Sequence, residues 1–92
     1  MSHTHDGKDR LLARVRRIRG QVEALEKALE LEKGCGEILH LIAASRGAMN
    51  SLMAEIVEGH IRYHVVDPRR KPSAETIQSA EDLIDLVHSY LR

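Results

Sequence analysis

Apolar residues recur at steps of three and four along most of this 92-residue chain, which is the spacing of amphipathic helices. The pattern predicts a first helix over about residues 6–31, a second over 35–65 and a third over 74–91. The glycines of EKGCG, residues 32–36, separate the first two. The segment DPRRKPS, residues 67–73, contains both prolines and is predicted to be a loop.

The ends and inner faces of the helices can be assigned from short polar residues and apolar spacing. Asp6 is the expected N-cap of the first helix, and Ser73 that of the third, because short oxygen-bearing side chains accept bonds from free backbone N–H groups. The apolar side chains expected on the inner face of the third helix are Ile77, Leu83, Ile84, Val87 and Leu91.

The second predicted helix is apolar on more than one side, and at about 45 Å it is too long for the other two to cover. The chain has no Trp or Phe, so its core must come from aliphatic side chains. We therefore expect a single all-α domain, residues 1–92, whose second helix pairs antiparallel with that of another chain. Doubling of this dimer is a further possibility.

The charge is unevenly distributed although the net charge is zero. Residues 1–20 hold six Lys or Arg and two Asp, a balance of +4, whereas residues 21–60 hold three Lys or Arg and seven Glu, a balance of −4. A basic arm on a neutral protein favours an anionic partner.

Within the basic region, RLLARVRRIRGQ (residues 10–21), cations recur at helical spacing and no acid interrupts them. This stripe consists of Arg10, Arg14 and Arg17, with Lys8 before it, Arg16 and Arg19 beside it and Gln21 after it. Such spacing suits phosphate contacts, so the pattern predicts nucleic-acid binding, with a solvated helix face as the alternative. No helix-turn-helix is visible, which favours readout of DNA shape and backbone.

Two histidines, His60 and His64, stand four residues apart and therefore share one helix face. They could form a two-point metal clamp or be ordinary surface residues.

The single cysteine, Cys35, begins the second helix, where a helix N-terminus favours the metal-binding thiolate, although lone cysteines are often small apolar residues. Cys35 and His60 are about 37 Å apart along one helix, so they cannot share a metal within one chain. Antiparallel pairing would bring Cys35 to the histidines of a partner, giving two symmetric sites.

Further donors lie near the N-terminus. Ser2 is small, so Met1 is expected to be removed, which leaves a free amine at Ser2 that could chelate together with His3; His5 follows, and a simple tail is the alternative. His40 and His88 are expected to be ordinary packing or surface residues. One soft donor with several imidazoles suits Co(II), Ni(II) or Zn(II), although raw affinity favours copper.

Several function classes are disfavoured. A single cysteine allows no intrachain disulfide, which makes the reducing cytoplasm the default compartment. No apolar run approaches about 20 residues, and the first ten residues do not form a signal peptide. A metal hydrolase ranks low because no carboxylate stands near the histidine pair as in HExxH; Glu58, two residues before His60, points to another face. We therefore expect no enzyme, and a plain helical scaffold stays open.

The segments RVRRIRGQVEALEKAL and IAASRGAMNSLMAEIVEGHI, the lone cysteine and the final LVHSYLR resemble the CsoR/RcnR family across nearly the whole chain. These are small all-helical repressors that sense copper, nickel/cobalt or formaldehyde. The resemblance implies a disc-shaped homotetramer, a dimer of dimers built from antiparallel four-helix bundles. It also implies that the effector releases operator DNA and derepresses an exporter or a detoxifying enzyme.

The resemblance also implies roles for particular residues. The nickel/cobalt branch resembles a His-Cys-His-His ligand set, which falls here on His3, Cys35, His60 and His64. Gly34 and Tyr63 depart from this branch, in which relatives can carry acidic residues at these places. Ni(II) or Co(II) is thus the expected effector, with Zn(II), copper or formaldehyde, the last through a nucleophilic Cys35, as alternatives. The DNA-contacting residues implied by the resemblance are Arg14, Arg17 and Gln21, with Arg46 added from the second helix.

Overall fold

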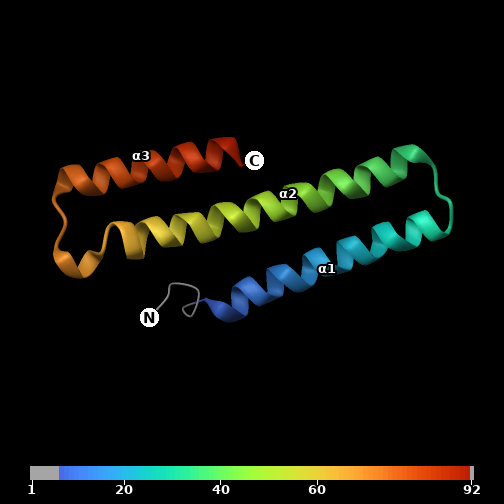
Figure 1. The fold of residues 1–92 in the computed structure, drawn as a ribbon, viewed down its shortest axis with the longest axis horizontal. Helices are drawn as coiled ribbons and strands as arrows, with labels where there is room; N and C mark the ends of the chain where they lie inside the picture. Colours follow the sequence, from blue (N-terminus) through green and yellow to red (C-terminus); the bar gives the residue numbers. More distant parts are fainter. Residues whose placement is uncertain (1–6, 92) are drawn as a thin grey trace.

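The computed structural model describes residues 7–91, and every regular element in that range is helical. The all-α prediction of three helices is confirmed (Figure 1). In chain order the elements are α1 (Lys8–Glu30), α2 (Cys35–His60), the π-helical η1 (Ile61–Val65), the 3-10 turn η2 (Pro68–Arg70) and α3 (Ala74–Tyr90).

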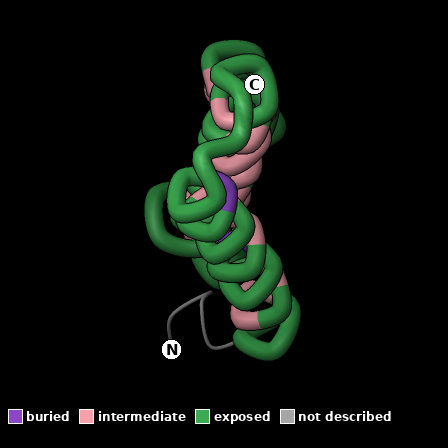
Figure 2. The backbone as a smooth tube through the Cα atoms, turned by 90° about the vertical axis from the view of Figure 1, so that its right-hand side faces the viewer, coloured by how far each residue is buried: buried purple, intermediate pink, exposed green. Residues whose placement is uncertain are grey.

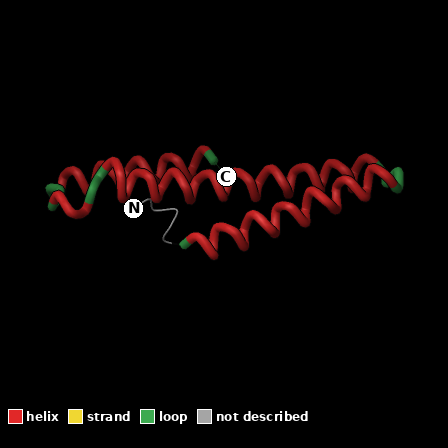
Figure 3. The backbone as a smooth tube through the Cα atoms, turned by 60° about the horizontal axis from the view of Figure 1, so that its bottom comes forward, coloured by secondary structure: helices red, strands yellow, loops and turns green. Residues whose placement is uncertain are grey.

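The long helix α2 is the centre of the fold, with α1 and α3 running antiparallel to it on opposite sides (Figure 1). α3 accompanies only the C-terminal part of α2, and α1 diverges from α2 towards its own N-terminus (Figure 3). The molecule measures 56 × 25 × 12 Å, so its thinnest dimension is close to the diameter of one helix. The chain is therefore a flat layer with two broad faces.

A layer one helix thick buries few side chains, and most of the backbone in Figure 2 is exposed or half-buried. The buried apolar residues of the described chain are Ile18, Ala28, Ala54, Ile61, Ala80 and Ile84. The accessible surface is 7088 Å², compared with about 5400 Å² for a compact protein of this mass. The radius of gyration is 17.4 Å, where about 12 Å is typical of a compact domain of this length. One chain alone therefore leaves much of its apolar surface in contact with water.

An uncovered stripe runs the length of α2, and we call it the α2 seam. Its members are Cys35, Leu39, Ile42, Arg46, Met49, Met53, Ile56 and His60, at alternating steps of four and three residues. This seven-residue repeat is the spacing of helices that pair along a seam. Met49 and Met53 are each about half exposed, at 53% and 52%. The seam supports the expected antiparallel pairing between chains, which itself stays a prediction.

The helix ends agree in part with the sequence-based assignments. Ser73 caps α3 as predicted, since its Oγ accepts a bond from the Thr76 N–H at 3.1 Å. The predicted cap Asp6 lies outside the described residues; the N-cap of α1 is Gly7, whose φ of 92° suits a residue without a side chain. Leu83 and Ile77, both expected on the inner face of α3, are 45% and 47% exposed. Ala80, Ile84 and Val87 form the face turned to α2 and η1, and Ile77 lines an open cavity at the start of α3.

No helix in the described part of the chain is long and apolar enough to cross a membrane.

The seam generates the first testable prediction. Replacing the half-exposed Met49 by Glu is tolerable in a single chain but would bury a carboxylate if two seams pair. We expect Met49→Glu to shift the protein from a tetramer to smaller species in light scattering. Ala74→Glu, which adds the same charge at the exposed start of α3, should leave the mass unchanged. A wild-type protein that is a stable monomer would contradict the prediction.

Candidate metal and DNA-binding sites

His60 and His64 form a stacked pair at the end of the long helix. Their ring centroids are 5.4 Å apart and the ring planes meet at 29°. His60 is the last residue of α2, and His64 belongs to the π turn η1, in which the Val66 N–H donates to the Ile61 carbonyl at 2.9 Å. π turns of this kind are often found at functional sites. The two imidazoles lie together on an exposed side of the helix end.

Cys35 is the first residue of α2 and is exposed, at the opposite end of that helix from His60. Among residues 7–91 no three His, Cys, Asp or Glu side chains gather closely enough to hold a metal ion. Both Cys35 and His60 nevertheless belong to the α2 seam, one at each end. The midpoint between them falls at Gly47 and Ala48, so antiparallel pairing about that point would set Cys35 of one chain against His60 of its partner.

The donors nearest the N-terminus, His3, His5 and the Ser2 amine, lie outside the described residues. Their point of attachment is defined, however, because α1 begins beside the C-terminal end of α2. Arg10 pairs with Glu55, and a groove of about 290 Å³ is lined by Arg10 and Leu11 on one side and by Glu58 and Gly59 on the other. Because six residues span at most about 20 Å, the arm starts within reach of the α2 end of its own chain.

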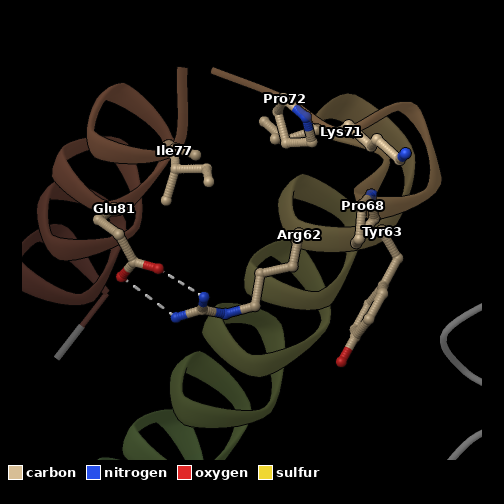
Figure 4. Close-up of a pocket in the computed structure, with 9 residues that line it drawn as sticks. Arg62, Tyr63, Pro68, Lys71, Pro72, Ile77 and Glu81 are labelled. Atoms are coloured by element: carbon tan, nitrogen blue, oxygen red, sulfur yellow. Dashed lines mark hydrogen bonds and ion pairs between the residues drawn. The ribbon is translucent and has the colours of Figure 1, made fainter. Parts of the chain in front are cut away.

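A polar cluster connects α3 to the segment that holds the histidines. Both Nη atoms of Arg62 donate hydrogen bonds to the Glu81 carboxylate, at 2.6 and 3.3 Å (Figure 4). It also donates from Nε to Glu58 at 3.2 Å, and Glu58 in turn lies 2.6 Å from Nε2 of His88. Arg62 stands between His60 and His64 in sequence, so the cluster fixes the backbone that carries both.

The electrostatics of this cluster favour its ion pairs. The hydrogen bond from His88 and the charge and bonds of Arg62 hold the pKa of Glu58 below its usual value, despite partial burial that acts the other way. The bonds to Glu81 and then to Glu58 raise the pKa of Arg62. Sequence reasoning missed this cluster, because it considered Glu58 only as a general base beside His60 and interpreted His88 as an ordinary packing or surface residue. The four-residue spacing of Glu58 and Arg62 was the available signal.

A shallow cavity of about 480 Å³ opens beside this cluster, between η1, the loop of residues 67–73 and α3 (Figure 4). Arg62, Tyr63, Pro68 and Ile77 are among the residues that line it.

The predicted DNA-contacting residues Arg14, Arg17 and Gln21 line one groove of about 450 Å³ between α1 and α2. Arg14 is held against α2 rather than extended into water. Its Nη1 donates to Glu55 Oε2 and its Nη2 to Ser51 Oγ, both at 2.5 Å. The Gln21 side-chain oxygen is buried without a hydrogen-bond partner in the described structure.

The remaining predicted DNA-binding residues divide between two faces. Lys8 and Arg10 are exposed at the start of α1 and extend the row of Arg14. Arg46 is exposed on the α2 seam, about 180° around the helix from Glu55, which faces α1. Within one chain Arg46 and Arg14 therefore lie on opposite sides of α2 and do not form one continuous surface.

Comparison with known proteins identifies the family. Residues 7–89 match the family described as "Metal-sensitive transcriptional repressor". The chain is 39% identical over its full length, and the full length of the relative, to the transcriptional repressor RcnR of Citrobacter koseri. It is 49% identical, with the same complete coverage, to an uncharacterized protein in the bioA 5′ region of Serratia marcescens.

A solved structure agrees with the fold. A glutamate-to-histidine variant of the formaldehyde-responsive regulator FrmR from Salmonella enterica serovar Typhimurium is 44% identical, with a TM-score of 0.65. The match covers 95% of this chain and 96% of that chain. This chain therefore belongs to the CsoR/RcnR/FrmR family of metal- or formaldehyde-sensitive transcriptional repressors. The expectation of a regulator rather than an enzyme is thereby confirmed.

The polar cluster around Arg62 generates the second prediction. We expect Arg62→Gln to lower the free energy of unfolding by about 1 kcal/mol, because the bidentate pair with Glu81 is well formed but partly exposed to water. Amide hydrogen exchange should rise mainly in α3. Arg69→Gln is the matched control, since the partner of Arg69 among residues 7–91 is Asp67, two residues away in the same loop. Equal effects of both substitutions on α3 exchange would contradict this account.

Proposed function

We propose that this protein is a Ni(II)- or Co(II)-responsive repressor that binds operator DNA without metal and releases it on binding metal, thereby derepressing a metal exporter. The observation that carries the proposal is the α2 seam, which ends in Cys35 at one side and His60 at the other. We further propose a homotetramer, built as a dimer of dimers, that acts on DNA in the cytoplasm.

The metal would be held by Cys35 of one chain together with His60 and His64 of its partner. His3 and the Ser2 amine would complete the ligand set. The start of α1 borders a groove at the end of α2 in the same chain, which favours an origin of these two donors in the chain that supplies the histidines. A thiolate with several imidazoles suits borderline divalent ions. Gly34 and Tyr63 offer no carboxylate, so Zn(II) and copper stay as alternatives within the same site.

The DNA would be contacted through phosphates by the α1 stripe, with Arg14, Arg17 and Gln21 at its centre and Lys8 and Arg10 at its start. The six residues before α1 lead directly from the proposed metal donors into this stripe. Metal binding would draw that arm toward the end of α2 and favour an α1 position in which the cations no longer match the phosphates. Release then follows from the stronger binding of metal to the state that does not bind DNA.

A formaldehyde sensor is the second candidate, favoured by the 44% identity to a formaldehyde-responsive regulator and by the exposure of Cys35. In that chemistry the Cys35 thiol adds to the carbonyl carbon of formaldehyde to give a hemithioacetal. Condensation with the Ser2 amine would then expel water and leave a methylene bridge between sulfur and nitrogen.

The third prediction tests the DNA surface. Arg14→Ala and Arg17→Ala should each weaken binding to an operator selected from random DNA by the metal-free protein. Each lost phosphate contact should reduce the slope of log affinity against log salt by about one. Wild-type affinity and slope in both variants would mean that the stripe is only a solvated face.

The fourth prediction separates the two effectors. Release of the selected operator by nickel or cobalt should be lost in His64→Ala and Cys35→Ala and weakened in His3→Ala. The matched control His40→Ala, an exposed histidine of α2 outside the site and its supporting cluster, should respond like the wild type.

The formaldehyde candidate replaces the metal proposal under a different result. In that case His3→Ala and His64→Ala would respond to nickel and cobalt as the wild type does, and Cys35→Ala would abolish a response to formaldehyde.

A further inference from the structure

We infer that Glu55 is an internal counter-ion that competes with DNA phosphates for the arginines of α1 and so limits the affinity of the protein for DNA. This inference rests on the proposed DNA-binding function of the α1 stripe and specifies how that surface is regulated within the chain.

The geometry places one carboxylate beneath two cations of the stripe. Oε2 of Glu55 accepts from Arg14 Nη1 at 2.5 Å, and Oε1 pairs with Nη1 of Arg10. The second Nη of Arg14 is occupied by Ser51. The Glu55 side chain is 19% exposed, whereas that of Arg10 is 69% exposed, so the acid lies below the cations and not beside them in open water.

This arrangement opposes phosphate binding in two ways. Glu55 cancels one of the three positive charges of Arg10, Arg14 and Arg17. A phosphate that approaches Arg14 either shares the guanidinium with Glu55 and is repelled by the nearby carboxylate, or must displace the carboxylate from Arg14. Displacement breaks a charge-assisted bond and leaves a half-buried carboxylate with fewer partners.

The position of Glu55 also relates the DNA surface to the proposed metal site. Glu55 lies on α2 five residues before His60, and its partners lie at the start of α1, next to the root of the N-terminal arm. A shift of α1 along α2 changes how strongly Glu55 holds Arg10 and Arg14. The same carboxylate thus sets how many α1 cations are available to DNA.

The test measures affinity for a mixed-sequence DNA duplex by fluorescence anisotropy over a range of salt concentrations, with the full-length metal-free protein. Removing the competing charge in Glu55→Gln should steepen the salt dependence by about 0.9 and strengthen binding roughly eightfold at about 0.1 M salt, with the gain fading towards 1 M. Circular dichroism and light scattering verify the fold and the mass. If Glu55→Gln does not fold, Glu55→Met, of similar volume, carries the same expectation.

Two controls locate the effect. Glu23→Gln removes the same charge from the opposite face of α1, where Glu23 is 4.0 Å from Arg19, and should leave both affinity and slope nearly unchanged. In an Arg14→Ala background the gain from Glu55→Gln should fall by at least half, since one of its two cationic partners is gone.

The outcomes separate this inference from the proposed function. A wild-type protein that binds DNA and releases its selected operator with metal, while Glu55→Gln binds no more tightly or binds more weakly, would overturn the inference alone and make Glu55 a support for the arginines. Equal gains in Glu55→Gln and Glu23→Gln would also overturn it. A wild-type protein that binds no DNA at any salt concentration would overturn both.

Discussion

The uncovered apolar seam of α2 is the constraint on which the rest of this structure depends. α1 and α3 cover two sides of α2, and the layer they form is only 12 Å at its thinnest. Half-exposed residues such as Met49 and Met53 then remain on a face that no part of the described chain covers. Burial of apolar surface is the main favourable contribution to folding, so this face strongly favours association with another chain. The same seam carries Cys35 and His60, which gives the stabilising contact and the proposed metal site a common origin.

The proposed DNA-binding and metal-binding surfaces are connected to α2 by ion pairs. Arg10 and Arg14 hold the start of α1 to Glu55, and Arg62 holds α3 to the helix end that carries the histidines. Both connections are ion pairs between elements, and the one to α3 stands beside the apolar cluster of Ile61, Ala80 and Ile84. Such pairs are weak enough to rearrange when a ligand binds one state better than another. A thin fold with a small core would allow the shift of α1 that is proposed for effector binding.

Much of the fold could be predicted from the sequence, because helical periodicity and the Ser73 cap depend on neighbouring residues. The position of His60 and His64 on one face of the helix could be predicted for the same reason. The π turn at Ile61–Val65 could not be anticipated, since its register depends on how Ile61 and Val66 pack against α3. The partners of Arg14 were also missed, because Glu55 is forty-one residues away and becomes its neighbour only when α1 folds back on α2. Leu83 was misassigned because periodicity identifies two apolar faces on α3 but not which one meets α2.

The central claim, that two chains complete one metal site, is tested most directly by mixing two inactive variants. Cys35→Ala chains lack the thiolate and should give no thiolate-to-cobalt charge-transfer absorption. His64→Ala chains keep the thiolate but lack one imidazole, so they should give at most a weakened band. In mixed dimers one site regains Cys35 from one chain and both histidines from the other. The account predicts that co-refolding the two variants restores part of this absorption with added Co(II). Absence of the band in a mixture shown to contain mixed dimers, while the wild type displays it, would contradict a site shared between chains.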